Sequence, residues 1–207
     1  MKALLGLVAV IVILVLIFGG MYVSTKNKIV TMDEQVKSNW AQVDVVLQRR
    51  ADLIPNLVET VKGIAVQEQT VFGDIAKARS ALLSAGTPTD KIAANQRLDS
   101  ALGRLLLVVE NYPQLKSNEN FLRLQDELAG TENRIAVERR RYNETLQDYN
   151  TYLSLFPNSL VASLSGFQRN DAYFKTDEGA RQAPKVNFDY SKPPATAPAP
   201  APAPAKP

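Results

Sequence analysis

The sequence begins with an uninterrupted apolar stretch, which constrains the fold more than any other feature. Residues 3–23 read ALLGLVAVIVILVLIFGGMYV and contain no charged side chain. A helix rises about 1.5 Å per residue, so this length spans roughly the 30 Å of hydrocarbon in a bilayer. We therefore predict a short N-terminal end at residues 1–2 and a transmembrane anchor at residues 3–23, which contacts the lipid bilayer.

A cleaved signal peptide is the competing interpretation of this stretch. Signal peptides have a shorter apolar region, of about 7 to 15 residues, followed by a small-residue cleavage site. No Ala-x-Ala site follows here, which favours a retained anchor. Lys26, Lys28 and Lys37 lie shortly after the stretch and only Lys2 precedes it, so the lysine excess favours a cytoplasmic C-terminal side.

The other end of the chain has an unusual composition. Apart from Thr196 and Lys206, residues 193–207 are all proline or alanine. Such a segment has no large apolar side chain to bury and favours extended polyproline II. We predict a disordered, Pro/Ala-rich tail at residues 191–207, which leaves residues 24–190 for one folded domain.

Residues 24–190 are helical by pattern. From Val36 to Ala65, apolar side chains recur at steps of three and four, as in an amphipathic helix. Pro55 interrupts this helix and predicts a bend, because proline removes one backbone hydrogen bond. Thr31 and Glu34 could form a capping box that begins the helix independently, or the membrane helix could continue into it.

Three further helices are expected. The first covers residues 67–85 with Gly86 as its C-terminal cap, and the third ends at Pro157. The second begins with Thr87 as its N-cap, and its apolar face consists of Leu98, Leu102, Leu105 and Val109. The apolar seam of this third, longest helix includes Phe156. The predicted fold is all-α: an N-terminal transmembrane helix followed by an antiparallel bundle of about four helices, two of them long.

The helical pattern weakens after Pro157. Residues 159–165 predict one or two helical turns that end at Gly166, and the aromatic segment that follows has no helical period. We expect this extended segment to pack back on the bundle through four side chains: Tyr173, Phe174, Val186 and Phe188.

The composition excludes most enzyme classes. None of the 207 residues is a cysteine or a histidine, so the chain cannot form a disulfide, a Cys/His metal site or a His-dependent nucleophile. No glycine-rich phosphate-binding motif is present, and the net charge of +3 does not indicate nucleic acid as a partner. We therefore expect a non-enzyme with no catalytic residue, no metal and no cofactor.

Two polar clusters remain as candidate sites. One surrounds Pro55, and the other is the charged run TENRIAVERRRYN on the longest helix. From them we select four candidate residues: Arg50, Asp52, Asn133 and Arg139. They can form a structural network that satisfies the helix turn broken by proline, or a site for an anion or a metal between the two long helices.

Three stretches resemble the LemA family of bacterial membrane proteins: WAQVDVVLQRRADLIPNLVETVKG (Trp40 to Gly63), YPQLKSNENFLRLQDELAGTENRIAVERRRYNETLQDYN (Tyr112 to Asn150) and LFPNSLVA (Leu155 to Ala162). The resemblance implies a single-pass protein of the bacterial cell (inner) membrane with its N-terminus outside and its domain in the cytoplasm. It brings no established catalytic activity or ligand.

The membrane anchor, the long apolar seams and the missing catalytic groups together favour an interaction protein over a ligand-binding protein. We expect a membrane-anchored helical scaffold or interaction protein of the bacterial envelope, which forms homo-oligomers or binds other membrane proteins. The alternative is a ligand-binding bundle, in which the four candidate residues hold an anion or a metal.

Overall fold

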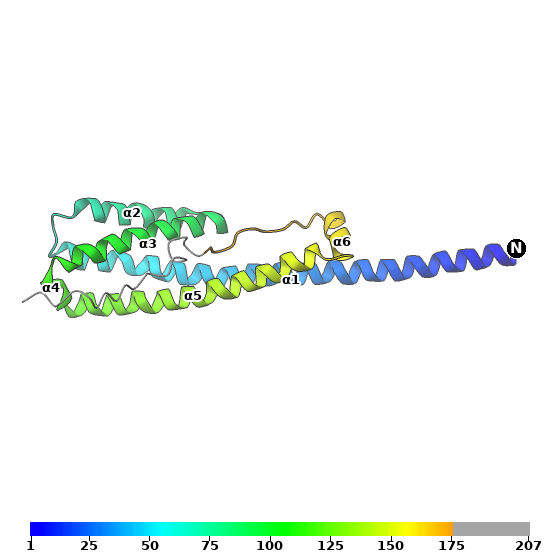
Figure 1. Ribbon diagram of the computed structural model, residues 1–207, viewed down its shortest axis with the longest axis horizontal. Coiled ribbons are helices and arrows are strands. Elements are labelled where there is room, and N and C mark those ends of the chain that lie inside the picture. The colour runs from blue at the N-terminus through cyan, green and yellow to red at the C-terminus, as the bar shows by residue number, and fades with distance from the viewer. Residues whose placement is uncertain (176–207) are drawn as a thin grey trace, which may run out of the picture. The chain divides into compact units, whose positions relative to one another are not determined.

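The computed structural model describes residues 1–175, and its regular structure there is entirely helical (Figure 1). The helices are α1 (Lys2–Lys62), α2 (Gln69–Ser84), α3 (Pro88–Glu110), α4 (Pro113–Lys116), α5 (Glu119–Ser154) and α6 (Asn158–Ser165). The all-α prediction is confirmed, including the short helix expected at residues 159–165, which is α6; α4 was not predicted. The predicted Pro/Ala tail, and Val186 and Phe188, lie outside the described residues.

The membrane stretch and the first amphipathic helix form one helix. α1 contains 61 residues without interruption, which corresponds to a length of about 90 Å. Thr31 lies inside it and donates from Oγ1 to the Asn27 carbonyl at 2.9 Å, so Thr31 does not begin a new helix. The N-terminal part of α1 is long and apolar enough to cross a membrane, and residues 4–21 are all exposed.

The helices pack as two antiparallel pairs. α5 lies along α1, and α3 lies along α2, as Figure 1 shows. The core between α1 and α5 includes Val43, Leu47 and Leu146, whose exposed fractions are 1% or less. The predicted apolar face of α3 is buried as well: Leu98, Leu102, Leu105 and Val109. These pairs confirm the antiparallel bundle.

Local capping chemistry determines where several helices begin and end. Thr87 caps α3 by accepting a hydrogen bond from the Asp90 amide at 3.1 Å, and Pro88 occupies the first helical position. Gly166 ends α6 with φ of 79°, a left-handed conformation that glycine adopts without strain. Both predictions are confirmed.

Two details of the sequence reading were wrong. α2 ends at Ser84 and is followed by the extended residue Ala85, so Gly86 does not form a left-handed cap. α5 ends at Ser154, before the proline, and Phe156 is 81% exposed rather than part of the seam. The apolar spacing of α5 continues past its last residue, Ser154, and the spacing alone does not show where the helix ends.

Residues 167–174 return along α5 as an extended segment. Asn150 binds both backbone groups of Asn170, donating to its carbonyl at 2.7 Å and accepting from its amide at 3.0 Å. Asn143 binds Phe174 in the same way, at 2.8 and 3.0 Å. The two asparagines are seven residues apart and therefore share one face of α5. As predicted, Tyr173 and Phe174 pack against the core.

Candidate functional site

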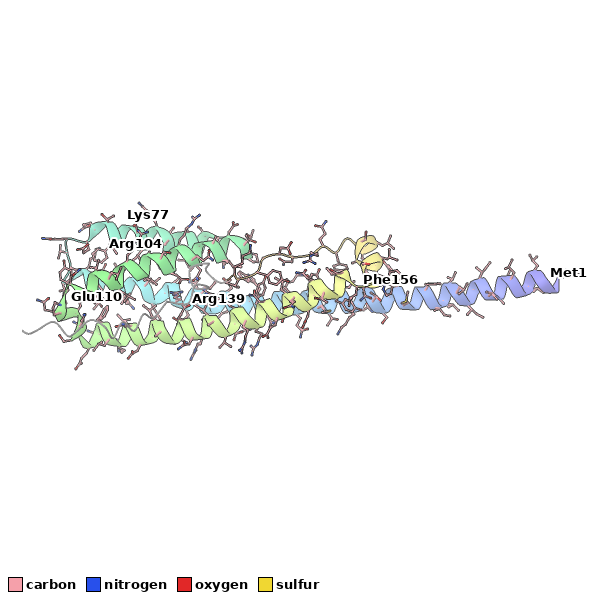
Figure 2. All side chains as sticks on the ribbon, in the orientation of Figure 1. Met1, Lys77, Arg104, Glu110, Arg139 and Phe156 are labelled. Atoms are coloured by element: carbon pink, nitrogen blue, oxygen red, sulfur yellow. The ribbon has the colours of Figure 1, made fainter. Side chains whose placement is uncertain are left out.

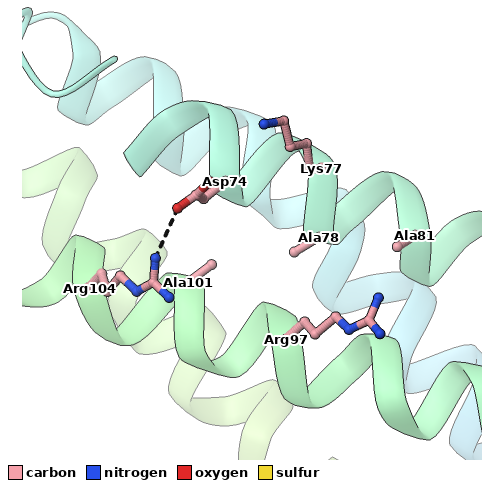
Figure 3. A pocket seen from close by; sticks show the side chains of 7 residues that line it. All are labelled: Asp74, Lys77, Ala78, Ala81, Arg97, Ala101 and Arg104. Carbon is pink, nitrogen blue, oxygen red and sulfur yellow. Dashed lines mark hydrogen bonds and ion pairs between the residues drawn. The ribbon is translucent and has the colours of Figure 1, made fainter. Parts of the chain in front are cut away.

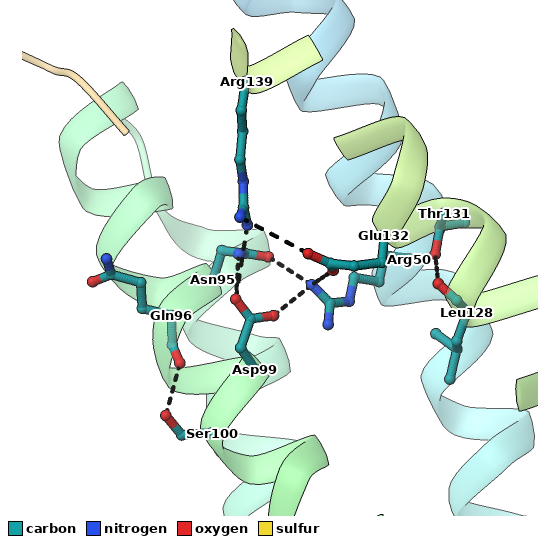
Figure 4. Close-up of polar contacts among 9 residues, drawn as sticks. All are labelled: Arg50, Asn95, Gln96, Asp99, Ser100, Leu128, Thr131, Glu132 and Arg139. Atoms are coloured by element: carbon teal, nitrogen blue, oxygen red, sulfur yellow. Dashed lines mark hydrogen bonds and ion pairs between the residues drawn. The ribbon is translucent and has the colours of Figure 1, made fainter. Parts of the chain in front are cut away.

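Five polar side chains from three helices meet at the centre of the bundle (Figure 4). We call this group the charge cluster: Arg50, Asn95, Asp99, Glu132 and Arg139. α1 contributes the first residue, α3 the next two and α5 the last two. The cluster thereby joins the α1–α5 pair to the α2–α3 pair.

Arg50 is the centre of the charge cluster. Its side chain is only 9% exposed, and its Nη1 lies 2.5 Å from Asp99 Oδ1 and 2.8 Å from Glu132 Oε2. Arg139 approaches the same two carboxylates at 3.7 and 3.9 Å. Two arginines against two carboxylates give a formal charge of zero, so the cluster compensates its own burial without an added ion.

Hydrogen-bond capacity is left over in this neutral group. The buried Nε atoms of Arg50 and Arg139 have no hydrogen-bond acceptor among the described residues. Buried donors without a protein partner normally bind water or a ligand oxygen. Asp99 Oδ1 and Glu132 Oε2 are also buried and have only their ion pairs with Arg50, so both donors and acceptors of the cluster are incompletely satisfied.

The structure brings together two of the four predicted site residues. Arg50 and Arg139 share the two carboxylates, whereas Asp52 and Asn133 are exposed outside the cluster. Asp52 accepts instead from Gln48 at 3.0 Å. The reason is geometric: residues two apart on a helix point about 200° apart, so Arg50 and Asp52 cannot face one site.

Sequence reasoning missed Asn95, Asp99 and Glu132. One signal was available for Asn95, because it lies three residues before Leu98 on the apolar face of α3 and is 0% exposed. Glu132 lies within the charged run TENRIAVERRRYN but was not selected, and Asp99 carries no signal of this kind. They occupy ordinary charged helix faces and become a site only through the packing of α3 and α5 around Arg50.

The helix turn broken by proline is satisfied from another helix. Pro55 has no amide hydrogen, so the carbonyl of Ala51, four residues earlier, loses its helical partner. Arg79 of α2 replaces it by donating from Nε to the Ala51 carbonyl at 2.7 Å. None of the four predicted residues supplies this donor, and local sequence did not indicate Arg79.

An aromatic group lies next to the charge cluster. Trp40, Tyr142 and Phe174 pack with ring centroids 5.2 to 6.1 Å apart, and the Arg139 guanidinium lies 5.1 Å from the Phe174 ring. The Tyr142 hydroxyl is buried without a hydrogen-bond partner in the described chain. Its burial, together with the nearby Tyr173, raises the pKa of Tyr142 to about 12. The phenol thus stays neutral at physiological pH.

An apolar groove separates α3 from α5 on the side of the charge cluster away from the aromatic group. It consists of two hollows of about 220 and 410 Å³, which share Leu106 and Gln125. We call it the α3/α5 groove, lined mainly by Leu57, Leu102, Leu105, Leu106, Val109, Phe121, Leu122 and Leu128. Arg50 and Glu132 line the hollow nearer the charge cluster, and Glu110 and Lys116 line the other, so the groove carries charged side chains at both ends.

A separate hollow, of about 280 Å³, lies between α2 and α3 (Figure 3). Three cations line it, Lys77, Arg97 and Arg104, and Asp74 accepts from Arg104 at 2.9 Å. Their heads lie at the open surface, where ion pairs and charges are well solvated. Across residues 1–175, acidic side chains do not gather in the groups of three or more that a metal ion would need.

One apolar helix able to cross a membrane, continuous with an open helical bundle, defines a class of membrane-associated helical proteins. The chain matches the LemA family over residues 39–188, which is more than half of its length. The protein belongs to the LemA family, as the three sequence stretches indicated.

Several curated relatives share most of this region. The protein named Magnetosome protein MamQ 2 of Paramagnetospirillum magneticum is 28% identical over 175 residues, covering 72% of this chain and 64% of its own length. The MamQ protein of Magnetospirillum gryphiswaldense is 26% identical, covering 74% and 66%. The protein named LemA of Metamycoplasma hominis is 24% identical, covering 85% and 78%. The chain thus spans slightly less than two thirds of the MamQ relatives.

Proposed function

We propose that the protein is a non-enzymatic scaffold, anchored by one helix in the bacterial cell (inner) membrane, with its bundle in the cytoplasm. In this role it binds further copies of itself or other membrane proteins of the envelope. The α3/α5 groove carries the proposal, because two leucines of its apolar lining, Leu106 and Leu122, are exposed on the bundle away from the membrane stretch.

The groove has the properties of a protein-binding surface. Leu106 and Leu122, which line it, are 45% and 43% exposed. Contiguous apolar side chains on a folded domain mark interaction sites, and a groove between helices suits an amphipathic helix from a partner. The charge cluster at one end limits how far such a helix can penetrate, which would fix its position along the groove.

Cysteine cross-linking tests this function well, because the natural chain contains no cysteine. We expect the full chain with Leu122→Cys or Leu106→Cys to give cross-linked products in intact cells. Arg140→Cys is the matched control, since its side chain is 74% exposed and Arg140 does not line the groove. A reporter fused after Pro207 would test the cytoplasmic side in the same cells.

Products that appear with the two groove variants and not with Arg140→Cys support the proposal, and their mass distinguishes self-association from another partner. Groove variants that yield no product, in a protein that migrates as a monomer in mild detergent, would contradict the scaffold role.

The second candidate function is oxyanion or metal binding at the charge cluster. The unsatisfied Nε atoms of Arg50 and Arg139 favour the oxyanion, because guanidinium donors cannot ligate a metal. Inorganic phosphate and magnesium chloride, added separately to the purified full chain, should then raise its melting temperature, and phosphate should have no such effect on Arg139→Met. A wild-type melting temperature that neither additive changes would eliminate this candidate.

A further inference from the structure

Large apolar side chains are exposed on α6 and on the turn before it. Leu155, Phe156, Leu160 and Leu164 are 54%, 81%, 56% and 78% exposed. Leu160 and Leu164 are four residues apart, so they lie on the same face of the helix. The opposite side contributes Val161 and Ala162 to the core, at 6% and 4% exposure. α6 is therefore apolar on its outer side as well as on its inner side.

The position of α6 along α1 explains this outer face. Ser165 Oγ and the Tyr22 hydroxyl form a hydrogen bond of 3.0 Å, and Tyr22 is the second-last residue of the apolar stretch 3–23. Immediately after it, Thr25 and Ile29 are covered, at 7% and 0% exposure. Before it, side chains such as Phe18 remain 60% exposed. α6 thus lies where α1 changes from a bare helix to a packed one.

Figures 1 and 2 show the same arrangement. α6 is at the end of the bundle from which the N-terminal part of α1 projects, and Phe156 lies at that end, toward Met1. α4, which joins α3 to α5, is at the opposite end. The two most exposed large apolar side chains after the membrane stretch, Phe156 and Leu164, therefore lie at the end of the domain nearest to it.

We propose that α6 and its preceding turn form a second membrane contact, which inserts Phe156, Leu160 and Leu164 into the interface of the bilayer that α1 crosses. Helices with an outward apolar face lie in the region between headgroups and acyl chains, and tyrosine is enriched at that depth. The exposed Lys26 and Lys28 follow within two turns on α1, at the level of lipid phosphates. The inference requires α1 to cross the bilayer but does not depend on self-association.

The bilayer fits this surface better than a second copy of the chain does. At the depth of Tyr22, lipid surrounds α1 on every side that α5 and α6 leave free, so no further molecule is needed to cover three apolar side chains. Attachment at two points, α1 and α6, would hold the bundle at a fixed tilt. A single helix leaves it free to rotate about the helix axis.

Site-directed fluorescence in vesicles tests the inference, again with single-cysteine variants of the full chain. Phe156→Cys, Leu160→Cys and Leu164→Cys would each carry an environment-sensitive fluorophore in vesicles of phosphatidylcholine with a minority of phosphatidylglycerol. Lipids bearing a quencher near the headgroup are then introduced. Val45→Cys is the matched control, because Val45 is 65% exposed on α1 but about 33 Å beyond Val23.

We expect the lipid quencher to remove most of the fluorescence at positions 160 and 164 and to leave position 45 unchanged. Val12→Cys, at the middle of the apolar stretch, verifies insertion of α1 in vesicles whose lipids carry the quencher on the acyl chain instead. Quenching at Val12→Cys but at none of the three α6 positions would overturn the inference and leave the anchor intact. Positions shielded from water but not quenched by lipid would identify a protein partner instead and would also overturn it. Failure at Val12→Cys would overturn both the inference and the membrane anchor.

Discussion

Replacing Arg79 by methionine tests whether a side chain from α2 repairs the helix turn that Pro55 breaks. The Ala51 carbonyl is the acceptor, 2.7 Å from Arg79 Nε, in a residue that is 0% exposed. Methionine keeps most of the aliphatic length of arginine and removes its donors. Lys77→Met is the matched control, because Lys77 is an exposed cation on the same helix.

The expected loss follows from the kind of hydrogen bond. Hydrogen bonds to a charged partner contribute about 1.5 to 3 kcal/mol to stability, and a buried acceptor without a partner is costly. We therefore expect Arg79→Met to lower the free energy of unfolding by about 2 kcal/mol. Lys77→Met should change it by less than about 0.5 kcal/mol, as exposed substitutions usually do.

A double-mutant cycle with Pro55→Ala tests whether the loss in Arg79→Met comes from the bond to the Ala51 carbonyl. In Pro55→Ala the new amide can bond to the Ala51 carbonyl, so Arg79 is no longer needed as its donor. The loss caused by Arg79→Met should then fall below about 1 kcal/mol in that background. Urea unfolding of the full chain in detergent, followed by circular dichroism and by the fluorescence of Trp40, the only tryptophan, measures all four proteins. An equal loss in both backgrounds would refute the assignment of the Ala51 carbonyl as the acceptor.

Three further substitutions test other contacts of the bundle. Asn150→Ala removes both side-chain hydrogen bonds to the backbone of Asn170. It should speed hydrogen exchange of the amides in residues 167–174 by more than tenfold, which corresponds to about 1.4 kcal/mol or more. The control Ser163→Ala, at an exposed position, should leave this exchange unchanged. Arg50→Met should destabilise the bundle by up to about 3 kcal/mol, less than for a fully buried pair because Asp99 and Glu132 are 36% and 45% exposed; an effect as small as that of Arg140→Met would contradict the cluster. Burial raises the pKa of Tyr142 from 10.0 to about 12, so the stability that the neutral phenol contributes is present below pH 10 and is lost between pH 10 and 12. Tyr142→Phe should change the free energy of unfolding little at pH 7 and should reduce the loss of stability at alkaline pH. An unchanged dependence of stability on pH in this variant would argue against the raised pKa.

Local chemistry explains which parts of this fold were predictable. The Thr87 cap, with Pro88 and Asp90 after it, is complete within four residues, and so is the glycine end of α6. Apolar periodicity also predicted the inner faces of α1, α3 and α5, because a stripe on a helix must be covered by something. It could not predict that α1 is continuous, since a capping box and an uninterrupted helix fit the same residues.

Contacts between helices explain what was missed. Asp99 and Glu132 resemble many other surface carboxylates until the packing places them 2.5 and 2.8 Å from Arg50. Arg79 lies 28 positions from Ala51, so nothing near Pro55 indicates it as the donor. Phe156 fits the spacing of the α5 seam and fails because α5 ends two residues earlier. In each case the decisive partner is distant in sequence, where pattern and propensity carry no information.

The continuity of α1 also limits how a scaffold of this form can act. No loop separates the membrane stretch from the bundle, so the direction of the helix in the bilayer is transmitted directly to the domain. Leu57, which lines the α3/α5 groove, is 34 residues beyond Val23 and therefore about 50 Å from the membrane end of the stretch. A partner that binds in the groove must reach this height. Another copy of the chain satisfies that requirement by construction, because its own groove lies at the same distance from the bilayer, whereas a membrane protein with only short loops does not.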